Sequence, residues 1–233
     1  MVLPNSIPDE SGLYLSDIFP TSYHCVVDTG VKEGDVIGIW GLGPIGMCAA
    51  RWCQIKGAKR IIGIDRVGTR LKMAAERLGI ETLDFSVHKD VVKRIREMVP
   101  EGLDCALDCG TTFSIRAHFL SDSQTRISGT FHEPKTLMHK AQKMLMLETD
   151  VPETINECLM SVRNMGRVGI IAAYAGYTNG FNVGCLMERG IRLIGNGQAP
   201  VHLYWEEILN EYLIPGKFDP TLCVVPAKFA GYD

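Results

Sequence analysis

The residues of this chain best spaced for a specific chemistry are three glycines, Gly41, Gly43 and Gly46, and one acid, Asp65. The glycines follow an apolar run, and Asp65 ends a second apolar run roughly 20 positions further on. In this pattern the first glycine permits a tight turn, the second lets the backbone approach a pyrophosphate, and the third lets a helix lie close to its strand. The acid accepts hydrogen bonds from a ribose. The spacing therefore predicts a dinucleotide-binding unit of strand, turn, helix and strand.

The helix after the glycine turn should supply the phosphate contacts. It begins near Pro44 and Ile45, and a proline suits a first helical position because its missing N–H has no partner to lose there. The remaining N–H groups of that turn would face the phosphates. Asp65 favours NAD because a carboxylate repels the 2′-phosphate of NADP, although an isolated aspartate at a strand end is as often a turn residue. Arg66 beside it could stack on adenine or accept a phosphate.

Composition and charge argue against several other classes of protein. The chain has 233 residues, 46% of them hydrophobic and 22% charged, with a formal net charge of −3. This balance supplies a sizeable core and gives no indication of nucleic-acid or membrane-surface binding. No apolar run reaches the roughly 18 residues of a spanning helix, and the N-terminus lacks the pattern of a signal peptide. The eight scattered cysteines, without a CxxC pair, fit reduced and buried thiols, so we expect a cytoplasmic protein.

Apolar patterning predicts the elements that must position the dinucleotide unit. We expect strands at residues 35–40, 60–65, 81–85, 103–108, 167–173 and 191–194, and helices at 45–56, 69–78, 89–99, 153–164 and 201–213. The strands are apolar on both faces, which is typical of a parallel sheet covered by helices. We therefore predict an α/β, Rossmann-type doubly wound parallel sheet with helices on both faces. Its ligand crevice should lie at the carboxyl ends of the strands, where the strand order reverses.

Residues 111–129 interrupt this alternation. The segment shows no helical or strand periodicity, and near-copies flank it, Gly110-Thr-Thr-Phe113 and Gly129-Thr-Phe131. A structureless stretch of that length directly after a strand is unusual in a compact domain. It is either a surface loop or an insertion that would obstruct the nicotinamide half of the site.

Five segments carry a resemblance to a known family: residues 13–24, 41–46, 62–65, 106–110 and 195–201. With these segments the chain resembles the zinc-type, medium-chain alcohol dehydrogenases. The nearest branch includes glutathione-independent formaldehyde dehydrogenase and related fungal enzymes. The resemblance covers most of residues 1–225 apart from the possible insertion, and its first and last segments are fairly specific.

The resemblance implies a dehydrogenase that uses NAD and a catalytic Zn²⁺. The zinc would polarise the oxygen of a small alcohol or aldehyde while hydride moves to or from the nicotinamide. Asp17 falls at the third protein zinc ligand, and Thr21 falls at a catalytic-site threonine that packs near the nicotinamide. The other implied positions bind the cofactor: Asp65 and Arg70 at the adenosine ribose, and Ile171, Ala173, Asn196 and Gln198 at the nicotinamide carboxamide.

Departures from the family pattern limit what the chain should do alone. A catalytic zinc needs three protein ligands, but only Asp17 is recognisable, and its alternative role is the N-cap of a helix over residues 18–27. We divide the chain into a remnant of the catalytic-domain junction (1–30), an NAD-binding domain (31–225, with the insertion at 111–129) and a tail (226–233). We expect a truncated form: the NAD-binding domain of such an enzyme, a non-catalytic NAD-binding module or an inactive fragment. An uncovered apolar face should favour association, so a homo-oligomer is one expected outcome.

Overall fold

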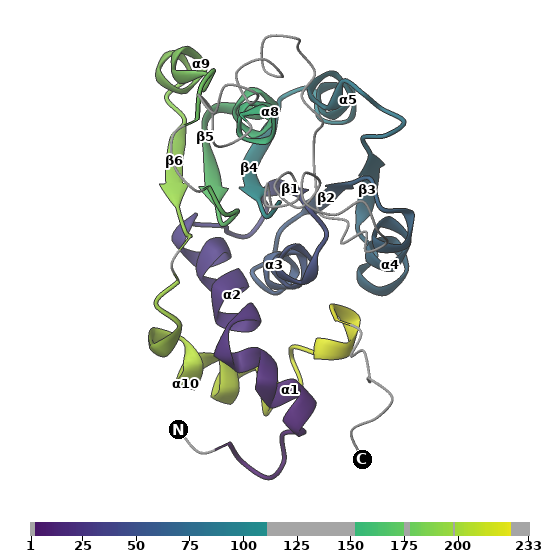
Figure 1. The fold of residues 1–233 in the computed structure, drawn as a ribbon, viewed down its shortest axis with the longest axis vertical. Coiled ribbons are helices and arrows are strands. Elements are labelled where there is room, and N and C mark those ends of the chain that lie inside the picture. The colour runs from purple at the N-terminus through teal and green to yellow at the C-terminus, as the bar shows by residue number, and fades with distance from the viewer. Residues whose placement is uncertain (1–2, 111–151, 175–177, 198, 225–233) are drawn as a thin grey trace, which may run out of the picture.

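A computed structural model describes residues 3–110, 152–174, 178–197 and 199–224. Within these ranges six parallel strands form one sheet in the order β3-β2-β1-β4-β5-β6 (Figure 1). The strands are β1 (Val36–Trp40), β2 (Arg60–Asp65), β3 (Glu81–Asp84), β4 (Leu103–Asp108), β5 (Val162–Ile170) and β6 (Arg192–Gly195). The strand order reverses between β1 and β4, as in a doubly wound fold. The predicted fold class is therefore confirmed.

Helices cover both faces of this sheet (Figure 1). On one face lie α3 (Pro44–Ile55) and α4 (Gly68–Leu78), and on the other lie α5 (Val91–Met98) and α8 (Glu153–Ser161). A short helix, α9 (Val183–Glu188), leads into β6. None of the helices in the described part of the chain has both the length and the apolar character of a bilayer-spanning segment.

In the described part of the chain, two clusters of buried side chains fill the space between the sheet and its helices. Ile37 and Ile39 of β1 belong to the cluster that includes residues of α3, whereas Trp40 of the same strand belongs to the cluster with Ile95 of α5 and Leu159 of α8. Successive residues of a strand point to opposite faces, so one apolar strand feeds both cores. This explains why the strands read as continuous apolar runs.

The prediction of buried thiols is confirmed for the cysteines in these cores. Cys48 and Cys53 of α3 and Cys105 of β4 are fully buried. Burial raises the pKa of each of these three thiols above its ordinary value. A thiol that resists ionisation is a poor nucleophile and a poor metal ligand, which fits a packing role.

The N-terminal and C-terminal segments pack together beyond α3 (Figure 1). Tyr23 packs edge-on against Trp52 of α3 with ring centroids 4.9 Å apart, and Trp205 donates to the carbonyl oxygen of Leu15 at 2.7 Å. Residues from both segments share the core cluster of α3. The expected insertion at 111–129 and the tail at 226–233 lie outside the described residues. The N-terminal segment contains α1 (Asp9–Leu13), η1 (Tyr14–Ser16) and α2 (Ile18–Asp28). The C-terminal segment contains η2 (Val201–Leu203), α10 (Trp205–Glu207), η3 (Ile208–Leu213) and η4 (Pro220–Leu222).

The predicted boundary between a helix over 153–164 and a strand over 167–173 is wrong. The helix α8 ends at Ser161, and β5 begins at once with Val162. Arg189 supplies the physical reason, because its guanidinium donates to the carbonyl oxygens of Leu159, at 3.0 Å, and of Val162. A longer helix would use those oxygens itself. The strand then bulges against β4, with Met165 at a φ of 60°.

The continuous helix predicted over 201–213 is also wrong. The segment divides into a 3-10 turn (η2), a single α-helical turn (α10) and a π-helical turn (η3). The π-helical turn places Ile208, Leu209 and Leu213 in the core. Tertiary packing therefore overrides a regular helical period here.

Candidate dinucleotide-binding site

The turn between β1 and α3 is held by backbone contacts that leave no room for side chains. Gly41 has a φ of 98°, in the left-handed region that favours glycine. A Cβ on Gly41 would lie 2.9 Å from the backbone of Cys109, and a Cβ on Gly46 would lie 1.7 Å from the carbonyl oxygen of Gly41. The exit of β1, the exit of β4 and the first turn of α3 therefore touch one another at these two glycines.

Gly43 differs from its two neighbours because no protein atom in the described ranges limits its size. It is the N-cap of α3, and an added Cβ would meet nothing within 4 Å. Pro44 and Ile45 follow as the first residues of the helix. The N–H groups of a helix's first turn lack intrahelical partners and carry partial positive charge. The open space in front of Gly43 therefore suits an anion such as a pyrophosphate.

Asp65 ends β2 and is 2% exposed. Its Oδ2 accepts the N–H of Leu42 inside the glycine turn at 2.9 Å, and its Oδ1 accepts the N–H groups of Arg66 at 2.7 Å and Val67 at 2.9 Å. Arg70 Nη1 lies 3.7 Å from Oδ2. The carboxylate is therefore already oriented by the protein, and it fastens the loop after β2 to the glycine turn.

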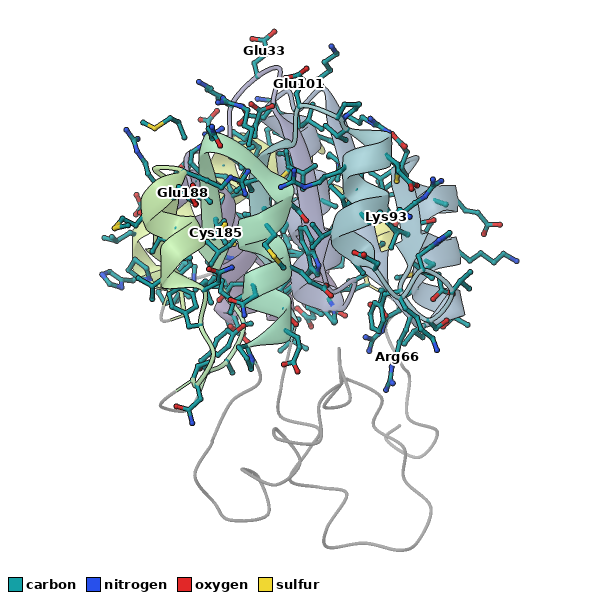
Figure 2. All side chains as sticks on the ribbon, turned by 90° about the horizontal axis from the view of Figure 1, so that it is seen from above. Glu33, Arg66, Lys93, Glu101, Cys185 and Glu188 are labelled. Carbon is teal, nitrogen blue, oxygen red and sulfur yellow. The ribbon has the colours of Figure 1, made fainter. Side chains whose placement is uncertain are left out.

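Two arginines flank this carboxylate. Arg70 lies in α4 with its side chain partly buried against Asp65. Arg66 is exposed, and its side chain projects away from the ribbon (Figure 2). An exposed guanidinium beside the expected ribose could contact adenine or a phosphate, so NADP has to be tested beside NAD.

The residues expected at the nicotinamide follow β5. The N–H of Ile171 donates to the carbonyl oxygen of Asp108 at 3.0 Å. Ala173 comes two positions later and is exposed. The end of β5 is therefore joined to the end of β4, beside the point where the strand order reverses. Gln198 lies outside the described residues.

Asn196 follows β6 and has a structural role that the sequence did not indicate. It is 1% exposed, its Oδ1 accepts the hydroxyl of Thr29 at 3.2 Å, and its Nδ2 donates to Asp28 Oδ2 at 2.8 Å. These contacts hold the carboxyl end of α2 against the sheet. Its backbone N–H donates to the carbonyl oxygen of Ile170 at 2.7 Å, so both the side chain and the N–H of Asn196 are bonded within the protein.

Asp17 and Thr21 pair with each other at the start of α2. The Thr21 hydroxyl donates to Asp17 Oδ1 at 2.9 Å. Asp17 occupies the N-cap position, as the alternative interpretation expected, but its side chain accepts no backbone N–H. The opposite end of α2, about 16 Å away along a helix of this length, is the end that meets the sheet. Within the described ranges no group of three His, Cys, Asp or Glu side chains could hold a metal ion, so the residues described do not fit a catalytic zinc site.

Asp108 lies at the carboxyl end of the sheet, and the sequence did not single it out as a candidate site residue. It ends β4 with none of its surface exposed. Its Oδ2 accepts the hydroxyl of Tyr174 at 2.7 Å, and its Oδ1 accepts the N–H of Gly110 at 3.2 Å. Burial raises the pKa of Asp108 to about 6. An acid at the end of an apolar strand, next to the reversal of strand order, is a signal that could have found it.

Comparison with known proteins agrees with this fold. A profile of the zinc-binding dehydrogenase family matches residues 44–133. A zinc-type alcohol dehydrogenase-like protein of Schizosaccharomyces pombe is 38% identical over 222 residues, which is 95% of this chain and 48% of that protein. Glutathione-independent formaldehyde dehydrogenase of Pseudomonas aeruginosa is 38% identical over 117 residues, which is 50% of this chain and 29% of that enzyme. The solved structure of alcohol dehydrogenase TADH from Thermus sp. ATN1 matches with a TM-score of 0.71 at 24% identity, covering 94% of this chain and 52% of that one.

The sheet and its glycine turn define a Rossmann-type nucleotide-binding domain, and the matched structure has the same fold. The sequence matches are more specific than the fold. The chain is similar to the zinc-type alcohol dehydrogenases over their nucleotide-binding domain. It spans about half the length of the Schizosaccharomyces pombe relative, so the activity of a whole family protein is a proposal for this chain.

Proposed function

We propose that this chain binds NAD at the carboxyl edge of its sheet. The pyrophosphate lies against the first turn of α3, and the adenosine ribose lies against Asp65. The observation that carries this proposal is the contrast among the glycines. A Cβ on Gly41 or Gly46 would meet the protein backbone, whereas a Cβ on Gly43 would meet no atom of the described residues within 4 Å. A ligand in front of α3 would give the glycine at position 43 a steric reason that the described residues do not supply.

Asp65 supports a ribose in particular. A carboxylate offers about four lone-pair positions, and three backbone N–H groups use three of them, two on Oδ1 and one on Oδ2. The remaining position on Oδ2 can accept one ribose hydroxyl. A 2′-phosphate at the same place would bring negative charge against a buried carboxylate, which favours NAD over NADP.

The similarity to this family supports a further proposal, that the protein transfers hydride between NAD and a small alcohol or an aldehyde hydrate. One relative is named as a formaldehyde dehydrogenase, which makes formaldehyde the first substrate to test. In this chain Thr21, Ile171 and Ala173 would meet the nicotinamide half of the cofactor. The residues described hold no zinc site, so we derive no step through the metal. A non-catalytic NAD-binding module is the alternative, and turnover decides between them.

Calorimetric titration of the 233-residue chain with NAD⁺ and with NADP⁺ tests the proposal. We expect NAD⁺ to bind, NADP⁺ to bind about tenfold more weakly, and Gly43→Ala to weaken NAD⁺ by about tenfold or more, because its Cβ occupies the space of the pyrophosphate. Thermal unfolding should show Gly43→Ala as stable as wild type. Gly184→Ala is the matched control, since its Cβ would meet only Asn182 Oδ1 at 3.7 Å in α9, away from the glycine turn.

Four outcomes of these measurements bear on the proposal. A folded chain that ignores NAD⁺ contradicts the proposal, and so does a Gly43→Ala variant that binds as tightly as wild type. Reduction of NAD⁺ with formaldehyde or a short alcohol in the presence of Zn²⁺ supports the dehydrogenase. Binding of NAD⁺ without any turnover supports the module.

A further inference from the structure

Among the described residues, Asp108 joins the carboxyl ends of β4 and β5 through both its backbone and its side chain. Its backbone oxygen accepts the N–H groups of Ile171 at 3.0 Å and Ala172 at 2.9 Å. Its side chain accepts the hydroxyl of Tyr174 at 2.7 Å and the N–H of Gly110 at 3.2 Å. We call these five residues the β4–β5 clip. The loop of residues 171–174 is therefore hydrogen-bonded to the end of β4 at three of its four residues.

We propose that Asp108 is a positioning residue for the nicotinamide half of the dinucleotide. Its carboxylate holds residues 171–174 in place through Tyr174, so that the backbone of this loop meets the nicotinamide. This inference rests on the proposed NAD binding, because it concerns the same site. The inference adds Asp108 to the site as a residue that contacts the loop of residues 171–174. Asp108 itself need not touch the ligand.

The burial of this acid indicates that the clip is more than packing. Asp108 has no ion pair among the described residues, and it faces Tyr174 from the loop after β5, Glu157 and Cys158 from α8, and Cys109 from its own strand exit. None of these groups is basic. A buried carboxylate without a cation is unfavourable compared with an apolar residue or an amide. Such groups gather where a ligand is handled.

The charge strengthens the clip. A hydrogen bond from a hydroxyl to an ionised carboxylate is roughly twice as strong as one between neutral groups. Burial, and to a smaller degree the nearby Glu157, raise the pKa of Asp108 to about 6. The carboxylate is therefore ionised at pH 7 and neutralised as the pH falls through about 6. The loop is held more weakly on the acid side.

Titration with two ligands separates this role from simple stability. NAD⁺ contains the nicotinamide, whereas ADP-ribose keeps the adenosine and the pyrophosphate and lacks it. We expect Asp108→Asn and Tyr174→Phe each to weaken NAD⁺ by about tenfold, the loss of one charge-assisted hydrogen bond. Both variants should bind ADP-ribose within about twofold of wild type. The ratio of the two affinities in wild type should fall as the pH drops through about 6, and Asp108→Asn should lose this dependence.

Asp104→Asn is the matched control, because Asp104 lies on the same strand at its other end. It should change neither affinity. Unchanged NAD⁺ binding in both Asp108→Asn and Tyr174→Phe overturns the inference while the proposed function stands. Equal weakening of NAD⁺ and ADP-ribose also overturns it, because the effect is then general. A wild-type chain that binds neither ligand overturns the proposed function, and this inference with it.

Discussion

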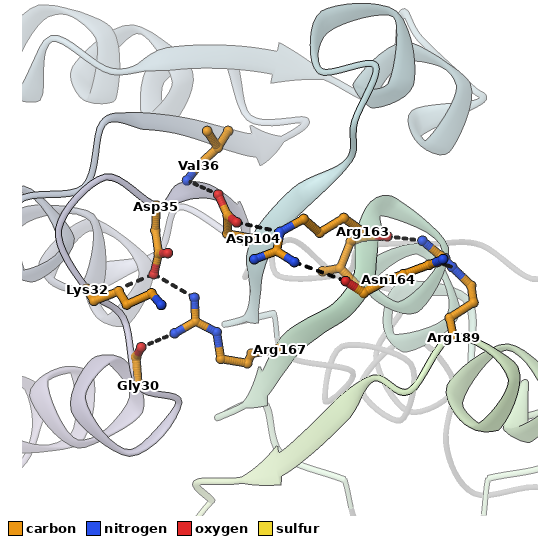
Figure 3. A network of polar contacts seen from close by, with 10 residues as sticks. Gly30, Lys32, Asp35, Val36, Asp104, Arg163, Asn164, Arg167 and Arg189 are labelled. Atoms are coloured by element: carbon orange, nitrogen blue, oxygen red, sulfur yellow. Dashed lines mark hydrogen bonds and ion pairs between the residues drawn. The ribbon is translucent and has the colours of Figure 1, made fainter.

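The two ends of β4 carry aspartates in opposite electrostatic settings. At the amino end, Asp104 accepts the N–H of Val36 at 2.9 Å and pairs with Arg163 at 2.6 Å (Figure 3). Burial alone would raise the pKa of Asp104, but these two contacts outweigh it and lower the pKa. At the carboxyl end, Asp108 has a tyrosine hydroxyl and an N–H as partners, and burial raises its pKa to about 6. In the described residues, β4 therefore carries one aspartate that is paired with an arginine and one aspartate that has no ion pair.

The same contrast extends along the sheet. At the amino edge, Asp35 pairs with Arg167 at 2.7 Å and accepts the N–H of Lys32 at 2.9 Å (Figure 3). At the carboxyl edge, Asp65 is held mainly by backbone N–H groups and Gly43 faces open space. The amino edge is arranged for stability. The carboxyl edge keeps charge and exposed backbone that stability alone does not require, as binding sites do.

The largest effect should come from the amino edge, at Arg167. Arg167→Met removes the partner of Asp35, whose side chain is only 4% exposed. A buried charge left without its partner destabilises a protein by about 3–5 kcal/mol. Arg167 also donates to the carbonyl oxygen of Gly30, which adds to the loss. Urea unfolding at pH 7 measures the change.

Arg167→Lys is the control for charge alone. It keeps the positive charge but cannot reach Asp35 and Gly30 together with one planar group, so it should lose about half as much. NAD⁺ binding by the folded fraction should be unchanged in both variants. A loss below about 1 kcal/mol in Arg167→Met would show that the amino edge is not the stabilising end.

The second effect has the opposite sign and lies at the carboxyl edge. The pKa of Asp108 in the folded chain is about 6, above its ordinary value of 3.8. Below the ordinary value the group is protonated whether folded or unfolded, and its burial has no charge penalty. The penalty grows as the pH rises and is complete above about 6. Asp108→Asn should therefore stabilise the chain at pH 7, by roughly 1–3 kcal/mol.

Urea unfolding of wild type and Asp108→Asn between pH 4 and pH 7.5, roughly the interval that spans both pKa values, checks this sign. The difference in unfolding free energy between the two proteins should increase as the pH rises. Together with weaker NAD⁺ binding, it would show stability exchanged for function at one residue. A destabilised Asp108→Asn at pH 7 would instead mean that the carboxylate is held as favourably as Asp104.

Much of this arrangement could be predicted from the sequence. The fold class followed from strands that are apolar on both faces. The glycine turn and Asp65 followed from spacing, because each position has one steric or hydrogen-bonding requirement that only one or two residue types meet. Such local rules act within a few residues of the chain, so a single sequence displays them.

The remaining features depend on contacts between distant parts of the chain. Arg189 ends α8 by donating to its carbonyl oxygens, and no pattern near residue 161 shows this. The resemblance implied a cofactor contact for Asn196 and gave no sign that its side chain holds α2. Asp108 was passed over because its partner Tyr174 lies far along the sequence. Polar side chains choose partners by geometry, and a linear sequence does not display that geometry.

The smallest effect should come from Arg163, whose side chain is 43% exposed. Arg163→Gln removes an ion pair with Asp104 that water already screens, so we expect a loss of at most about 1 kcal/mol at pH 7. The lowered pKa of Asp104 fixes the pH dependence. Its stabilising contribution is present above the ordinary value of 3.8 and disappears as the pH falls through the lowered pKa. The gap between wild type and Arg163→Gln in urea unfolding should therefore close on acidification.

The difference in unfolding free energy between wild type and Asp108→Asn also shrinks on acidification. Its sign is opposite, because Asp108→Asn is expected to be more stable than wild type at pH 7. Two aspartates of one strand thus predict variants displaced in opposite directions from wild type. If Arg163→Gln were destabilised by about 3 kcal/mol or more, its pair would behave as a buried one. If Arg163→Gln were more stable than wild type, the arginine would not stabilise the amino end of β4. The contrast with Asp108, which has no ion pair among the described residues, would then fail.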